Sequence, residues 1–171
     1  MVEQEAVNFE VAGSSPAVGA KKECLSLTTR AFFFFVILNT MSKVAKLVII
    51  NDRDKYLMLY RSGHPVFGDD PDLPGGTLES GEEPLDTMVR EVDEEVGVVI
   101  DGTTAQKIYE GKDYSSNGVQ YSLYSTKLDH TPEINMSWEH SDFEWLERDA
   151  FLEKAKHAND TYMHMVYEEL K

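Results

Sequence analysis

One stretch of the chain, residues 75–98, constrains its fold and its chemistry more than any other. It opens with the adjacent glycines Gly75 and Gly76 and closes with a run of carboxylates. Between them, apolar residues recur with the spacing of one helix face, which predicts a helix over Pro84–Glu95. Proline is tolerated in a first helical turn, and Gly97 is well placed to end the helix. We therefore expect a glycine loop followed by a helix whose last turn is acidic.

Three glutamates of this helix, Glu91, Glu94 and Glu95, stand at positions i, i+3 and i+4. A helix places all three on one face, where the carboxylates repel one another. A divalent cation removes that repulsion, and Mg²⁺ or Mn²⁺ prefers hard oxygen ligands such as carboxylates, water and phosphate. The pattern thus predicts a Mg²⁺ (or Mn²⁺) site suited to a phosphorylated substrate. A solvated acidic face is the plainer alternative for these three residues taken alone.

The wider spacing decides between these two alternatives. The pattern runs Gly76, five residues, Glu82, seven residues, and then Arg90-Glu91-Val92-x-Glu94-Glu95-x-Gly97-Val98. It resembles the Nudix box, with every defining position filled across 23 residues. The resemblance extends over residues 43–170 and implies that family's α/β fold, an α/β/α sandwich with a mixed β-sheet between helices. Strands mixed with helices along the chain agree with this fold.

Apolar and turn patterns place the remaining elements. Short β-rich segments separated by turn residues predict strands, and longer amphipathic segments predict helices. The first two strands are expected to form a hairpin. The expected strands are 44–50, 56–60, 98–101, 105–111, 119–128 and 142–146, and the expected further helices are 147–157 and 161–170.

The resemblance also implies a reaction, the hydrolysis of a diphosphate linkage by water with the help of bound divalent metals. Position by position, Glu91, Glu94 and Glu95 match the metal-binding glutamates of the family. The main-chain carbonyl of Gly75 or Gly76 would add a ligand, because only glycine allows so close an approach of the main chain.

Two further residues of the box, Glu82 and Arg90, match a supporting ion pair that holds the loop against the helix. The general base is left open by the sequence. Glu94 or Glu95 would serve from the helix, while many relatives use a glutamate from a later loop. Glu139 stands in such a loop and is a candidate for either metal binding or base work.

The composition limits the kinds of partner that this chain can bind. The net charge of −15 argues against a protein that tracks the phosphates of polymeric nucleic acid, but it allows a small nucleotide substrate because a bound metal inverts the local field. Cys24 is the only cysteine, which fits a reducing cytoplasm. The apolar run Ala31–Leu38 is too short to cross a bilayer, so we expect no membrane association. We expect a monomer or a homodimer.

The first 40 residues differ from the rest of the chain. Their small-residue, proline-containing segment Gly13–Ala20 is typical of loop or disorder. Met41 stands immediately before the first expected strand, like a natural start. We therefore divide the chain into an N-terminal extension, residues 1–40, either disordered or an over-extended start, and a Nudix domain, residues 41–171. An extra strand or hydrophobic arm is the alternative for the extension.

The box fixes the reaction type but not the substrate. The short domain resembles MutT-type enzymes, which hydrolyse nucleoside triphosphates, including 8-oxo-dGTP, to the monophosphate and pyrophosphate. In these enzymes a residue before the last helix contacts the purine edge, and Asn159 or Asp160 falls there, although a helix cap is the alternative role. Tyr114 stands where enzymes acting on diadenosine polyphosphates carry a tyrosine, and the absence of a proline there weakens an ADP-ribose assignment.

Tyr60, Arg61 and Phe67 precede the glycines and are candidates for stacking on a base, with a place in the hairpin as the plain alternative. A non-catalytic binding module of the same fold is the rival function. All the box carboxylates are present in this chain, which favours an enzyme.

Overall fold

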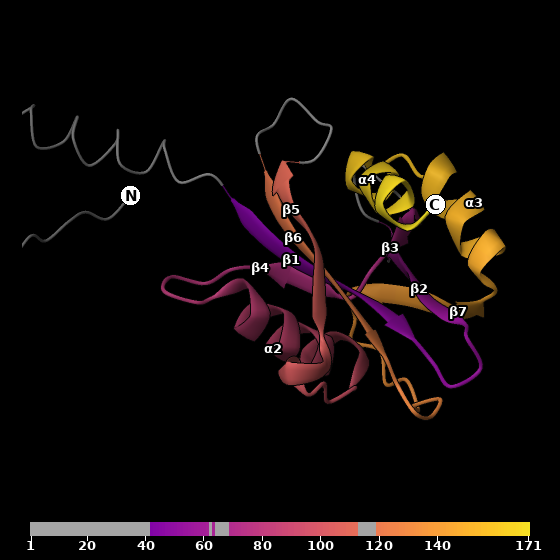
Figure 1. Cartoon of the computed structure of the whole chain (residues 1–171), viewed down its shortest axis with the longest axis horizontal. Coiled ribbons are helices and arrows are strands. Elements are labelled where there is room, and N and C mark those ends of the chain that lie inside the picture. The colour runs from indigo at the N-terminus through magenta and orange to yellow at the C-terminus, as the bar shows by residue number, and fades with distance from the viewer. Residues whose placement is uncertain (1–41, 62, 64–68, 113–118) are drawn as a thin grey trace, which may run out of the picture. The chain divides into compact units, whose positions relative to one another are not determined.

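The computed structural model describes residues 42–61, 63, 69–112 and 119–171 (Figure 1). The predicted extension, residues 1–40, lies outside the described residues.

In the described residues, seven strands form one sheet. Their bounds are β1 Lys43–Ile50, β2 Tyr56–Arg61, β3 Pro71–Asp72, β4 Gly75–Thr77, β5 Gln106–Lys112, β6 Gln120–Lys127 and β7 His140–Leu146. The strand order is β3-β2-β1-β6-β5, with β4 paired to β1 and β7 paired to β2. β1 and β6 run parallel, from Lys43 opposite Gln120 to Ile50 opposite Lys127, and the other pairs are antiparallel. The sheet is therefore mixed, as predicted.

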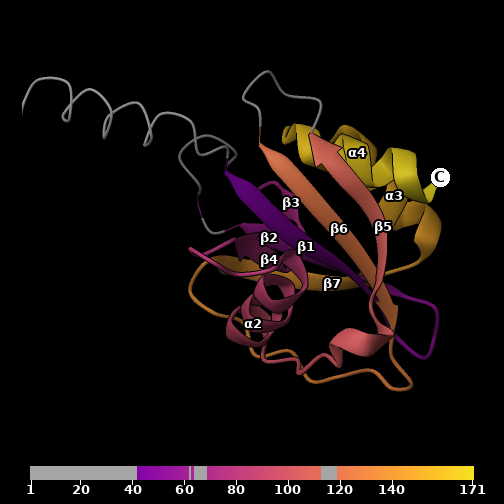
Figure 2. The same cartoon turned by 60° about the vertical axis from the view of Figure 1, so that its left-hand side comes forward.

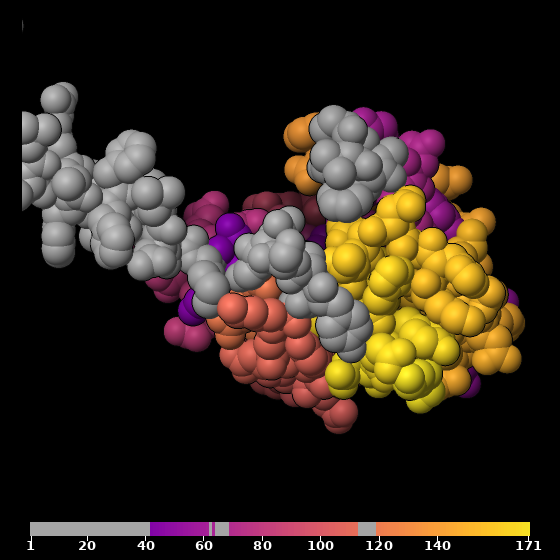
Figure 3. All heavy atoms as spheres, turned by 90° about the horizontal axis from the view of Figure 1, so that it is seen from above, coloured from indigo at the N-terminus to yellow at the C-terminus, as the bar shows by residue number. Residues whose placement is uncertain are grey.

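Three α-helices and one short 3₁₀ helix complete the described part of the chain. They are α2 Pro84–Val96, η1 Gly102–Thr104, α3 Arg148–His157 and α4 Thr161–Leu170. Helix α2 covers one face of the sheet, and α3 and α4 cover the other (Figure 1, Figure 2). On that second face α3 and α4 lie side by side (Figure 3). The expected α/β/α sandwich is confirmed.

Strand β1 is the centre of both cores, because its side chains alternate between the two faces of the sheet. Leu47 and Ile49 are fully buried in the cluster that includes Val92 of α2. Val48 points the other way and is buried in the cluster that includes Phe151 of α3. The near-continuous apolar sequence of β1 follows from this burial on both sides.

The strand predicted at residues 98–101 is wrong. These residues pair with no strand and lead from α2 into η1. The wrong prediction has its cause in alternating burial. Val98 and Ile100 are buried under α2, whereas Val99 is 82% exposed. An extended connection that packs every second side chain has the same pattern as a half-buried strand. The other predicted strands and helices are present, with ends that differ by at most two residues.

The structure contains two very short strands, β3 and β4, that are absent from the predicted strands. Strand β4 contains the two glycines and pairs with β1 so that Gly75 lies opposite Lys46 and Gly76 opposite Ala45. Gly75 has a φ of +127°, and a Cβ there would collide with the carbonyl of Ala45. The first glycine is therefore required by the close pairing of β4 with the central strand.

Candidate active site

The last turn of α2 is fixed to strand β4 by Glu95. Its Oε2 accepts a hydrogen bond of 2.7 Å from the main-chain N–H of Gly75. Gly97, with a φ of +68°, ends the helix and donates its N–H to the carbonyl of Asp93. Glu95 is only 6% exposed, and this burial raises its pKa, although the nearby ammonium of Lys46 acts in the opposite direction.

The carboxylate of Glu91 lies against the second glycine. A Cβ added to Gly76 would lie 2.5–2.7 Å from the carboxylate atoms of Glu91, far inside van der Waals contact. Only a residue without a side chain leaves this space to the carboxylate. The glycine loop thus brings main-chain groups and two helix carboxylates together, as the sequence predicted.

Arg90 ties the glycine loop to the helix. Its Nε and Nη2 donate to the two carboxylate oxygens of Glu82 at 2.9 and 3.0 Å. Its Nη1 also donates to Glu91 at 2.8 Å and to Glu94 at 3.1 Å. The hydrogen bonds from Arg90, together with that from Thr87, lower the pKa of Glu82 to about 2. The geometry is that of the supporting ion pair expected from the sequence.

These elements border a cavity of about 700 Å³. Its lining includes three of the predicted acidic residues, Glu91, Glu95 and Glu139, together with Gly76. Glu94 is not part of the lining, and its side chain is 60% exposed beside Arg90. The structure therefore brings together three of the four carboxylates proposed as metal ligands.

The donors in the cavity fit a hard divalent cation. The predicted ligands Glu91, Glu95, Glu139 and Gly76 offer carboxylate or main-chain oxygens, as Mg²⁺ and Mn²⁺ prefer, and the lining also contains the imidazole of His140. The buried carboxylate of Glu95 also has its pKa raised by desolvation, a cost that a bound cation would offset. As they stand, the described residues form no cluster of three or more metal-ligating side chains. In this arrangement Arg90 forms ion pairs with the carboxylates of Glu91 and Glu94.

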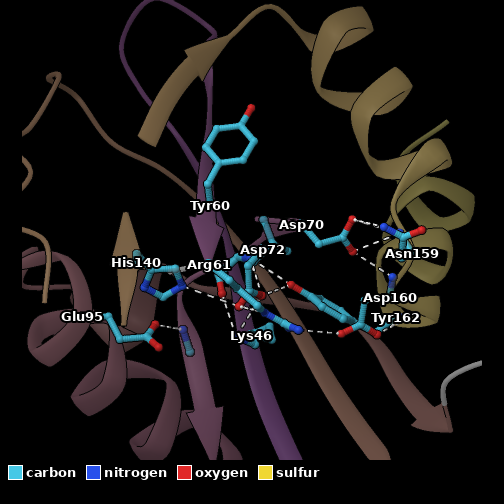
Figure 4. Close-up of polar contacts among 12 residues, drawn as sticks. Lys46, Tyr60, Arg61, Asp70, Asp72, Glu95, His140, Asn159, Asp160 and Tyr162 are labelled. Carbon is cyan, nitrogen blue, oxygen red and sulfur yellow. Dashed lines mark hydrogen bonds and ion pairs between the residues drawn. The ribbon is translucent and has the colours of Figure 1, made fainter. Parts of the chain in front are cut away.

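A buried charge cluster that the sequence did not predict adjoins these carboxylates (Figure 4). Asp72, which is 4% exposed, is its centre. Its carboxylate is 3.1 Å from Lys46 Nζ, 2.9 Å from Arg61 Nε and 3.5 Å from His140 Nε2. It also accepts a hydrogen bond from the hydroxyl of Tyr162.

Burial would raise the pKa of Asp72, but Lys46, His140 and Arg61 outweigh it and hold the pKa well below its usual range. The cluster therefore stays charged and links strands β1, β2, β3 and β7 to α4. Arg61 is the one member of the cluster that the sequence pointed to, as a candidate for base stacking and not as a partner of Asp72. The other contacts join residues far apart along the chain.

Of the two described residues proposed for base stacking, only one lies at the cavity. Arg61 lines the cavity, but its guanidinium is held by Asp72 and by Asp160 at 3.1 Å. Tyr60 is not among the lining residues and points away from the cluster (Figure 4). Its hydroxyl donates to Glu144 at 2.7 Å. Two further candidates for substrate contact, Phe67 and Tyr114, lie outside the described residues.

The residues before the last helix have structural contacts. Asp160 caps α4 by accepting a hydrogen bond from the N–H of Tyr162, so the predicted cap role is confirmed, and it also lines the cavity. Asn159 donates both its main-chain N–H and its amide Nδ2 to Asp70. It is not among the lining residues. Of this pair, Asp160 alone is placed to meet a ligand in the cavity.

Comparison with known proteins agrees with this geometry. The family model described as NUDIX domain matches residues 41–166. Among solved structures, a MutT protein from Methanosarcina mazei aligns with a TM-score of 0.63 and 20% identity, over 76% of this chain and 92% of that one. An Ap4A hydrolase from C. elegans aligns with a TM-score of 0.54 and 21% identity, over 74% and 92%. No curated protein matches the sequence.

A dihydroneopterin triphosphate pyrophosphohydrolase from E. coli aligns with a TM-score of 0.57 and 23% identity, over 74% of this chain and 92% of that one. At these identities the likeness concerns the fold, and two of these neighbours are named for different substrates. Fold and site together define a pyrophosphohydrolase, an enzyme that hydrolyses phosphorus-containing acid anhydrides. The chain belongs to the Nudix family, whose members generally use divalent metals.

Proposed function

We propose that the protein is a Mg²⁺-dependent (or Mn²⁺-dependent) MutT-like diphosphatase. It hydrolyses nucleoside triphosphates, ordinary or oxidised such as 8-oxo-dGTP, to the monophosphate and pyrophosphate. The observation that supports this proposal is that acidic and basic side chains line one cavity. Its volume of about 700 Å³ is in the range that holds a small-molecule ligand. It combines the carboxylates of Glu91, Glu95 and Glu139 with the cations Lys46 and Arg61.

The carboxylates of Glu91, Glu95 and Glu139 and the carbonyl of Gly76 would hold the metal. When bound there, the metal would supply positive charge against the diphosphate and would lower the pKa of a bound water. Glu94 stays a predicted ligand and catalytic residue, because its exposed side chain can turn toward the cavity without disturbing the core. The ion pair of Arg90 with Glu82 holds the glycine loop against the helix that carries these glutamates.

Two carboxylates of the cavity are candidates for the base that takes the proton of the attacking water, Glu95 and Glu139. Glu95 is buried and lines the cavity, where its carboxylate can face the attacking water. Its Oε2 accepts the N–H of Gly75, so the other oxygen is the one available for proton transfer. Glu139 precedes β7 in a loop that lines the same cavity.

The expected substrate is a small nucleotide, and we expect the enzyme to act in the cytoplasm as a monomer or a homodimer. Among the described helices, none has the length and apolar character needed to cross a bilayer. Diadenosine polyphosphates or other nucleoside diphosphates linked to a further group are the alternative substrates, and a non-catalytic nucleotide-binding module is the alternative of another class.

A substrate panel tests the proposal. The purified full chain is incubated with Mg²⁺ or Mn²⁺ and with ordinary and oxidised dNTPs, ADP-ribose, NADH, diadenosine polyphosphates and nucleotide sugars, and the products are identified. We expect a nucleoside monophosphate and pyrophosphate from a triphosphate, no turnover with EDTA, and recovery when Mg²⁺ is restored. Faster turnover of a diadenosine polyphosphate would establish the alternative substrate. Turnover of no compound, by protein shown to be folded, would overturn the proposal in favour of the binding module.

A further inference from the structure

Trp138 is the most exposed large apolar side chain among the described residues, at 86%. It lines the cavity that holds Glu91 and Glu95, and it directly precedes Glu139. Val99 is exposed to a similar extent, 82%, but it is not part of the lining. Single exposed apolar residues are common on protein surfaces, so it is the position of Trp138 that needs explanation.

The position of Trp138 is fixed from both sides. On one side, the N–H of Ser137 donates to the carbonyl of Glu95 at 2.8 Å, at the end of α2. On the other side, His140 is the first residue of β7, opposite Arg61 of β2, and its side chain is 2% exposed beside Asp72. Trp138 and Glu139 are the two residues between these anchors. The indole is therefore held at the cavity by contacts of its neighbours and not by its own burial.

The remaining aromatic residue of the lining is already engaged. Tyr121 is 9% exposed, and its ring stacks on that of Tyr162 at 5.3 Å with an interplanar angle of 6°. Most of the rest of the lining is polar or charged. Trp138 thus offers the large, solvent-facing aromatic surface of this cavity.

We propose that Trp138 is the residue on which the base of the nucleotide substrate stacks. This inference rests on the proposed function and names the part of the substrate that Trp138 binds. The base is the aromatic, uncharged portion of a nucleotide, and a planar ring gains most from an exposed indole face. Glu139, next in sequence, is one of the carboxylates assigned to the metal, and the metal would bind the diphosphate. Adjacent residues would therefore hold the nucleobase and the diphosphate.

A second copy of this chain is a less suitable occupant than a base. Each copy carries a net charge of −15, and a contact at this carboxylate-lined cavity would bring like charges together. A metal-bound nucleotide carries its own cation into the cavity and avoids that repulsion.

Steady-state kinetics of the Trp138→Leu variant test the proposal, with Trp138→Phe as the conservative variant and Val99→Ala as the control for loss of an exposed apolar side chain. For the best nucleotide of the panel, we expect Trp138→Leu to raise KM about tenfold, the loss of one stacked base, with kcat little changed. Trp138→Phe should retain most of the affinity, and Val99→Ala should behave as wild type. The inhibition constant of inorganic pyrophosphate, which has no ring, should be the same in all four proteins.

Fluorescence provides an independent measurement. The chain has two tryptophans, and in the Trp145→Phe variant Trp138 is the only one left. We expect nucleotide added with Ca²⁺ to quench this emission, and pyrophosphate with Ca²⁺ to leave it unchanged.

Unchanged KM in Trp138→Leu, or no quenching, would overturn the stacking role while the proposed function stands, provided the wild type hydrolyses the nucleotide. A kcat loss with constant KM would overturn it too, since that result places the indole in the chemical step. A change in oligomeric mass by light scattering in Trp138→Leu would assign the residue to a contact between copies and overturn the proposal. Failure of the proposed function itself would appear in the wild-type panel.

Discussion

The main-chain N–H of Gly75 donates a 2.7 Å hydrogen bond to the carboxylate of Glu95, which lies 20 positions later in the sequence. One contact therefore sets the distance between strand β4 and the last turn of α2. The two glycines before this helix have different roles, since Gly75 meets the main chain of β1 and Gly76 meets the side chain of Glu91. This difference leads to two separate predictions.

The Gly75→Ala variant is expected to lose stability. Its φ of +127° is unfavourable for alanine, and the added methyl group would collide with the carbonyl of Ala45, in a strand that cannot shift. We expect a loss of about 2–4 kcal/mol in urea unfolding. Gly81→Ala is the matched control, because Gly81 also has a positive φ, +90°, but open space around its Cβ position. The control should lose about 1 kcal/mol. Equal losses in the two variants would contradict the close approach at Gly75.

The Gly76→Ala variant is expected to lose activity with little loss of stability. Its methyl group would meet the carboxylate of Glu91, which is the end of a flexible side chain and can move aside. The displaced carboxylate would no longer be in place for the metal, so we expect turnover at fixed Mg²⁺ to fall about 10–100-fold. Mg²⁺ titrations of activity and a melting curve check both parts. Wild-type Mg²⁺ dependence in this variant would argue against Glu91 and Gly76 as partners of the metal.

Amide substitution should separate the glutamates of α2 by position. Glu95 is buried and lines the cavity, so Glu95→Gln is expected to lower kcat at least about 100-fold. Glu94 is exposed outside the lining and should show the smaller loss, below about tenfold. The pH profiles of kcat for Glu95→Gln and Glu139→Gln identify the base, since removal of the base abolishes the acidic limb. A larger loss in Glu94→Gln than in Glu95→Gln would show that Glu94 turns inward.

Glu82 should make stability depend on pH in the acid range. Its pKa in the folded protein is about 2, below the ordinary value of 4.5. Folding therefore favours the ionised carboxylate of Glu82. The contribution of this carboxylate to the free energy of unfolding is complete above pH 4.5 and is lost as the pH falls toward 2. The difference in unfolding free energy between wild type and Glu82→Gln should be constant near neutral pH and shrink below pH 4.5. A difference independent of pH down to 3 would contradict the pairing with Arg90.

Removal of residues 1–40 tests the proposed division of the chain. The family match begins at residue 41, and β1 begins at Lys43. We expect a protein that starts at Met41 to keep the full turnover and the melting temperature of the complete chain. Loss of folding in this shorter protein would show that the extension packs on the domain.

The local features of the sequence predicted the fold and half of the site. The helix α2, its glycine loop and the Arg90–Glu82 pair follow from residues close together in sequence, where spacing carries the signal. The cluster around Asp72 could not be predicted this way. Lys46, Asp72 and Tyr162 meet only because the topology brings β1, β3 and α4 together, and no local pattern encodes that meeting.

The solvent exposure of individual side chains could not be predicted from the sequence either. The loop of Trp138 gives no sign that its indole is solvent-facing while His140, two residues later, is buried. The alternation at Val98–Ile100 gave the opposite error, an apparent strand where an extended segment packs under α2. In each case tertiary packing decides what the local pattern leaves open.

The cavity draws its lining from Val44, the second residue of β1, through to Asp160, the cap of the last helix. Residues from both ends of the domain have to be in place before the cavity is complete. Turnover is therefore an assay for complete folding, and a nascent or truncated chain that ends before Asp160 would lack one wall of the cavity and leave the nucleotides around it intact.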